Sequence, residues 1–73
     1  MGGKAESAEG AIQLALDTDP QDPELHRELG YVYHAMQRDK EAVKAFRFYL
    51  DRNPAATDGE SIKTMIKNLE IEE

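Results

Sequence analysis

The apolar residues of the chain recur at helical spacing in four successive segments. Intervals of three and four residues place such positions on one side of an α-helix. Gly10 weakens the prediction for the first segment, residues 5–18, because glycine inside a helix costs about 1 kcal/mol relative to alanine. Pro20 ends this segment, because proline disfavours helical geometry in the residue before it. The apolar face of the segment consists of Ala8, Ala11, Ile12, Ala15 and Leu16.

A helical hairpin is expected between Pro23 and Pro54. Asp22 followed by Pro23 is a strong helix start, because an aspartate side chain caps free amides and proline suits the first helical position. The second helix is expected to continue to about residue 37, and a polar turn follows it. Asp39 is expected to cap the third helix, which ends before Pro54. The core faces of the two helices are Leu25, Leu29, Val32, Tyr33 and Met36, and Ala42, Ala45, Phe46, Tyr49 and Leu50.

A fourth helix is expected over residues 57–70. Thr57 and Glu60 stand three apart, the spacing at which the two side chains satisfy each other's free backbone amides at a helix start. The four segments together predict an all-α fold, with residues 1–73 as a single small domain. The core face of the fourth helix consists of Ile62, Met65, Ile66 and Leu69.

The first and third segments are copies of one pattern, separated by 34 residues. Adding 34 to each core position of the first helix yields a core position of the third, and Pro20 becomes Pro54. Self-similarity at such a period is the signature of a repeat architecture. The identical pairs in the two copies are Ala8/Ala42, Ala11/Ala45, Leu16/Leu50, Asp17/Asp51 and Pro20/Pro54.

The repeat resembles the tetratricopeptide repeat, whose pattern is W-x2-L-G-x2-Y followed by A-x3-F and P. The matching positions are His26, Leu29, Gly30, Tyr33, Ala42, Phe46 and Pro54. The chain departs from the family pattern in having His26 at the tryptophan position and Tyr49 where a small residue is usual. The resemblance implies antiparallel helical hairpins stacked as a short solenoid of about four helices. Residues 5–18 then form the second helix of a partial repeat, 23–54 a complete repeat and 57–70 a C-terminal capping helix.

The same resemblance implies a scaffold that binds a peptide or partner helix of another protein in a concave groove. Tyr31 is expected to face this groove, because it lies about 200° around the helix from Leu29. Tyrosine and arginine are enriched at binding hot spots. The alternative is that Tyr31 packs on the neighbouring helix and the polar residues beside it are merely solvated. The candidate groove residues are Arg27, Tyr31, His34, Ala35, Ser61, Met65 and Asn68.

The resemblance does not extend to the lysine, arginine and asparagine clamp with which some members hold the terminal carboxylate of chaperones. Arg27 is the one cation among the candidate groove residues, and Glu24 and Glu28 lie near it in the sequence. Repulsion between these carboxylates and an acidic tail argues against such a ligand.

A second candidate surface is a convex contact at Phe48, between the cations Lys44 and Arg52. Phe48 lies about 200° around the third helix from Phe46 and is expected to be exposed. Its equivalent in the first helix is Leu14, so both copies carry an apolar residue on this ridge. The alternative is a scattered surface hydrophobe, which needs no functional explanation.

Composition and charge narrow the classes of partner. A net charge of −6 opposes nonspecific binding to nucleic acid or to an anionic membrane surface. The lack of cysteine excludes disulfides and thiolate metal sites but leaves the compartment open, and we favour the cytoplasm over the periplasm. His26 and His34 are more than two helical turns apart and cannot ligate one metal. We therefore expect no cofactor, no metal and no enzyme activity.

Two alternatives to groove binding follow from the repeat. The first helix corresponds to the second half of a repeat whose opening helix is missing, so one of its faces lacks a partner. That face could form a homodimer. Alternatively, the segment is the terminal structural cap of a longer array and has no ligand of its own.

Overall fold

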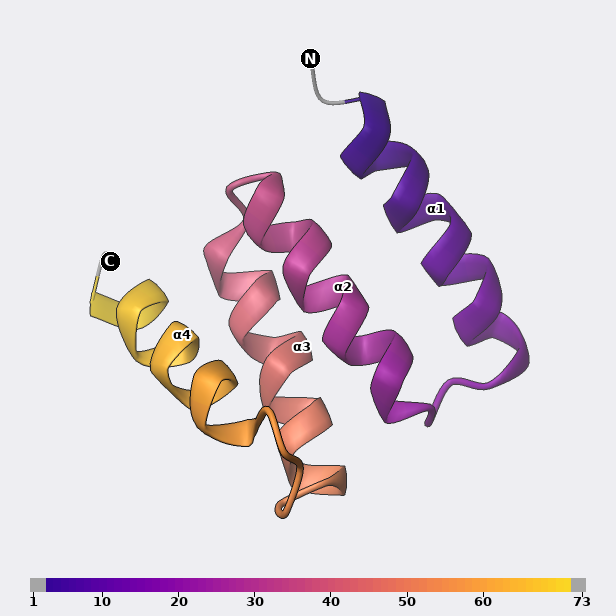
Figure 1. Cartoon of the computed structure of the whole chain (residues 1–73). Coiled ribbons are helices and arrows are strands. Elements are labelled where there is room, and N and C mark those ends of the chain that lie inside the picture. The colour runs from indigo at the N-terminus through magenta and orange to yellow at the C-terminus, as the bar shows by residue number, and fades with distance from the viewer. Residues whose placement is uncertain (1–2, 72–73) are drawn as a thin grey trace.

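The computed structural model describes residues 3–71, and over those residues it consists of four α-helices (Figure 1). The helices alternate in direction, and each packs on the helix before and after it in the chain. None of these helices is long and apolar enough to span a membrane. The all-α fold of stacked hairpins is therefore confirmed. The helices are α1 Gly3–Thr18, α2 Pro23–Ala35, α3 Asp39–Arg52 and α4 Gly59–Ile71.

The turn between α2 and α3 is closed by two backbone hydrogen bonds. The amide of Arg38 donates to the carbonyl of Tyr33 over 2.8 Å, and the amide of Gln37 donates to the carbonyl of His34 over 3.0 Å. Gln37, which follows the C-cap residue Met36, has a φ of 64°, the left-handed conformation common at that position of a helix end. This pair of hydrogen bonds ends α2 at Ala35, two residues before the expected end.

The prediction that Asp39 caps α3 is wrong. Arg38 occupies the cap position, and its carbonyl accepts a hydrogen bond from the amide of Ala42 over 3.0 Å. The tight turn already uses residues up to Arg38, so Asp39 becomes the first helical residue. There its negative charge is favourable next to the free amides of the helix start.

The predicted cap of α4 is also wrong. The helix begins at Gly59, and the carbonyl of Asp58 accepts from the amide of Ile62 over 3.1 Å. Asp58 therefore precedes the helix, and Thr57 lies one residue further outside, where it cannot form the reciprocal pair with Glu60. The carboxylate of Asp58 does not cap the helix but bonds to side chains of α2 and α3.

The core lies along α3, which has α2 on one side and α4 on the other. Phe46 and Ile62 are its largest fully buried side chains. Val43 is buried although it lies outside the predicted face of α3, because a helix packed on two sides buries a wider arc than one apolar stripe. The buried hydrophobic residues are Leu29, Tyr33, Ala42, Val43, Ala45, Phe46, Tyr49, Ile62, Ile66 and Leu69.

The closest approach in this core joins Gly30 of α2 to Phe46 of α3. A Cβ atom built on Gly30 would lie 2.5 Å from Cε1 of the Phe46 ring, well inside the limit of atomic contact. The ring is fully buried and cannot swing away without displacing its neighbours. Gly30 is therefore the residue that allows α2 and α3 to pack at this distance.

Gly30→Ala is expected to lower the free energy of unfolding by about 1–3 kcal/mol, the usual cost of overpacking a tight core. Gly10→Ala is the matched control, because Gly10 is also helical but has nothing within 4 Å of the place that a Cβ atom would take. That substitution is expected to raise the stability by up to about 1 kcal/mol, through helix propensity alone. Chemical denaturation of both variants measures the difference. Equal effects of the two substitutions would contradict the packing argument.

Candidate functional site

The exposed faces of α2 and α4 carry the residues predicted to line the groove. We call this surface the concave groove and define it as Arg27, Tyr31, His34, Ala35, Ser61, Met65 and Asn68. Tyr31, His34, Ala35, Ser61 and Asn68 are exposed, and Arg27 and Met65 are half-buried.

A shallow cavity of about 420 Å³ lies between the C-terminal end of α2 and the length of α4. It brings together four of the seven groove residues, and the other three lie outside its lining. The cavity is lined by His34, Ser61, Thr64, Met65, Asn68 and Leu69. Its walls combine apolar side chains with hydroxyl, amide and imidazole groups, which suits an apolar side chain flanked by polar atoms.

Tyr31 is both exposed and held in place. The residue is 43% exposed, and its ring meets the ring of Phe46 edge to face, with 5.1 Å between centroids. The contact forms because Gly30 leaves room for Phe46 beneath the surface of α2. An aromatic ring fixed by the core but open to water can take up a partner with little loss of side-chain freedom.

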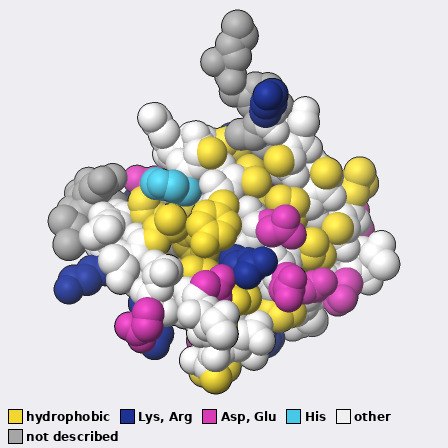
Figure 2. All heavy atoms as spheres, viewed as in Figure 1, with side chains coloured by type: hydrophobic (Ala, Val, Ile, Leu, Met, Phe, Trp, Pro, Cys, Tyr) yellow, Lys and Arg dark blue, Asp and Glu magenta, His cyan; other side chains and the backbone are white. Residues whose placement is uncertain are grey.

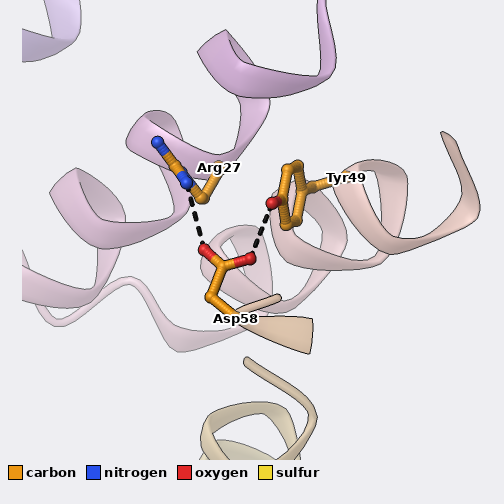
Figure 3. Close-up of polar contacts among 3 residues, drawn as sticks. All are labelled: Arg27, Tyr49 and Asp58. Carbon is orange, nitrogen blue, oxygen red and sulfur yellow. Dashed lines mark hydrogen bonds and ion pairs between the residues drawn. The ribbon is translucent and has the colours of Figure 1, made fainter. Parts of the chain in front are cut away.

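The polar centre of the site is a cluster of Arg27, Asp58 and Tyr49 (Figure 3). Nη1 of Arg27 donates to Oδ2 of Asp58 over 3.0 Å, and the hydroxyl of Tyr49 donates to Oδ1 over 2.7 Å. The guanidinium carbon of Arg27 also lies 5.5 Å from the centroid of the Tyr49 ring. The cluster therefore ties together α2, α3 and the residue that precedes α4.

Contacts within the cluster shift the pKa values of its three members. The hydrogen bond from Tyr49, reinforced by Arg27, holds the pKa of Asp58 below its ordinary value. The same hydrogen bond to Asp58, together with burial, raises the pKa of Tyr49. Asp58 likewise raises the pKa of Arg27. Asp58 is thus a carboxylate at neutral pH, and its charge balances that of Arg27 inside the chain.

Sequence reasoning did not identify Asp58 as a member of the site. Two signals pointed to it. Tyr49 is large and polar at a position where the repeat pattern has a small residue, so its buried hydroxyl needed a partner. In addition, Asp58 lies 34 residues after Glu24, which places an acidic residue at equivalent positions of the repeat.

The expectation that Phe48 is exposed is wrong. Its ring is half-buried and stacks on His26 at 3.7 Å between centroids, and the guanidinium of Arg52 lies 4.4 Å from its centroid. A ring nitrogen of His26 also lies 3.0 Å from the carbonyl oxygen of Pro20. The imidazole at the tryptophan position therefore fastens the start of α2 to α3, and it covers the ring that was expected to face solvent. Lys44 is exposed and, with Phe48, borders a second cavity of about 320 Å³.

Over residues 3–71, no group of three or more His, Cys, Asp or Glu side chains is placed to hold a metal ion. Nδ1 of His34 lies 4.0 Å from Oδ1 of Asp39. The arrangement of groups on this face is suited to recognition through shape, charge and hydrogen bonding.

Comparison with known families identifies the class of protein. The model of the tetratricopeptide repeat family matches residues 4–73, so the chain belongs to that family. The family is a non-catalytic helical repeat whose members bind other proteins or peptides, and this chain is a protein-interaction scaffold in that general sense. Comparisons with curated proteins and with solved structures find no match.

Asp58→Asn is expected to destabilise the chain in a pH-dependent manner. Because the pKa of Asp58 is lower in the folded state, its ionised form stabilises the fold above the ordinary pKa of 3.8. That contribution is lost as the pH falls through the lowered pKa that Asp58 has in the folded state. The difference in free energy of unfolding between the native chain and Asp58→Asn should therefore be largest near neutral pH and shrink in acid.

Denaturant titrations over a pH series measure this difference. Asp51→Asn is the matched control, because Asp51 is an exposed carboxylate on α3 outside the cluster. The same pH profile for both variants would contradict the assigned role of the cluster.

Proposed function

We propose that this chain binds a peptide or a partner helix of another protein in the concave groove. The observation that supports it best is Tyr31, whose ring is exposed to solvent yet held by Phe46. One helical turn further along the same face, His34 borders the 420 Å³ cavity on α4. An aromatic anchor next to a small cavity is the usual centre of a binding hot spot.

Binding in this groove would follow from preorganisation. The Arg27, Asp58 and Tyr49 cluster fixes the start of α4 against α2 and α3, so the two walls of the groove keep their spacing. A ligand then loses its own freedom on binding but does not have to order the site. Tyr31 and Met65 supply apolar area, and Ser61, Asn68 and His34 supply polar groups that select orientation.

Peptides selected from a random library displayed on phage, with the native chain as bait, test the proposal. Tyr31→Ala/His34→Ala is expected to bind the selected peptides about tenfold or more weakly, as loss of a hot-spot residue typically does. Lys44→Ala is the control, because Lys44 is exposed on α3 beside the other cavity. Circular dichroism verifies the fold of each variant. Unchanged binding by the double variant, or an equal loss with Lys44→Ala, would contradict groove binding.

A second candidate function, self-association, is favoured by the open face of α1. Leu14 is 71% exposed and Ala11 is exposed, while their equivalents 34 residues later, Phe48 and Ala45, lie half-buried and buried between α2 and α3. Among the described helices α1 packs only on α2. A second copy of the chain could cover this face and give a dimer.

Sedimentation equilibrium tests the dimer. The native chain should show a mass and a melting temperature that rise with concentration, and Leu14→Lys should abolish both effects. A monomeric native chain over the whole concentration range would rule out self-association.

The residues of α4 that correspond to the packing face of α2 support a capping role for that helix. Residues Lys63, Thr64 and Lys67 are exposed and stand 34 positions after Leu29, Gly30 and Tyr33, the residues through which α2 packs on α3. Lysines at these positions would oppose the packing of a further helix. Groove binding and a capping role for α4 are compatible, since Lys63 and Lys67 do not line the 420 Å³ cavity.

A further inference from the structure

We infer that the partner of the concave groove is a basic segment, in which an apolar anchor side chain is flanked by lysine or arginine. This inference rests on the proposed function and specifies the class of ligand that the groove would take.

The positive charge of the groove is already balanced. Arg27 is its one arginine or lysine, and its guanidinium lies 3.0 Å from the carboxylate of Asp58, whose ionised form is stabilised by Tyr49 (Figure 3). Each of the two paired side chains is 31% exposed. An acidic ligand that used Arg27 would compete with Asp58 and would place its own negative charge beside that carboxylate.

The negative charge on the same face is not balanced. Glu24 and Glu28 lie within about 60° of Tyr31 around α2, and both are exposed. The ion pairs found among residues 3–71 engage other carboxylates. Figure 2 shows acidic side chains bordering a hydrophobic patch on the face in view, and the chain as a whole carries a net charge of −6.

The relation between α2 and α4 indicates how a basic side chain would bind. Glu24 occupies in α2 the position that Asp58 occupies before α4, 34 residues later. Asp58 receives a guanidinium from the neighbouring helix, namely that of Arg27. Glu24 presents the equivalent carboxylate and is engaged by none of the ion pairs found among residues 3–71, so an arginine or lysine of a ligand can make the corresponding contact.

The apolar anchor of the ligand would bind at the end of the groove opposite Glu24. The cavity of about 420 Å³ includes Met65 and Leu69 in its lining, and His34 borders it from α2. Its size and polarity suit an aliphatic side chain. Glu24 lies ten residues, close to three helical turns, before His34, so the basic and apolar parts of the ligand would be separated by about 15 Å along the groove.

Fluorescence anisotropy with three synthetic peptides of equal length tests the inference. All three carry the same leucine anchors, and their remaining positions alternate alanine with lysine, glutamate or glutamine. The basic peptide is expected to bind about tenfold or more tightly than the acidic one, and its affinity should fall as salt is added. Glu24→Gln/Glu28→Gln should weaken its binding several-fold.

The matched control is Glu41→Gln/Asp51→Asn, which removes the same charge from exposed positions of α3. If the two double variants have equal effects, the preference for the basic peptide comes from net charge alone, and the inference is overturned. Tighter binding of the acidic or neutral peptide, lost in Tyr31→Ala/His34→Ala, would overturn the inference but leave groove binding intact. Binding of none of the three peptides would overturn it as well, while the phage selection decides groove binding separately.

Discussion

The fold depends most on the contact between the backbone of Gly30 and the ring of Phe46. It sets the distance between α2 and α3, and these two helices form the central hairpin on which α1 and α4 pack. It also positions Tyr31, because the Phe46 ring that fills the space at Gly30 meets the ring of Tyr31 edge to face. A constraint in the core thus determines how one exposed aromatic ring is held.

The Arg27, Asp58 and Tyr49 cluster extends this constraint to α4. Tyr49 occupies a position where the repeat family usually has a small residue, and its hydroxyl reaches the residue that precedes α4. The larger side chain is accommodated because Asp58 accepts its hydrogen bond and Arg27 balances the charge. One consequence is that the start of α4 is fixed against α2 and α3, and another is that Arg27 is engaged inside the chain.

Most of the fold could be predicted from the sequence, because apolar spacing and the 34-residue period report directly on helices and their packing. The caps of α3 and α4 could not be predicted: Arg38 and Asp58 take the positions expected for Asp39 and Thr57. The left-handed conformation of Gln37 makes Asp39 the first residue of α3 and not its cap. The sequence did not indicate that conformation, because Gln37 is not a glycine. Thr57 lost its expected role because Asp58 precedes α4 and bonds across the bundle.

The helix faces that carry the candidate site could be predicted from the sequence, but the contacts of its side chains could not. The exposure of Tyr31 followed from helix geometry, whereas the burial of Phe48 depended on a stacking partner, His26, from another helix. Contacts between side chains far apart in the sequence are not encoded in local spacing. The most direct test of groove binding is NMR shift mapping with a peptide obtained from the phage selection. We predict that the largest shifts fall on Glu24, Tyr31, His34 and Met65. Shifts confined to α1 or to the Phe48 side of α3 would contradict groove binding.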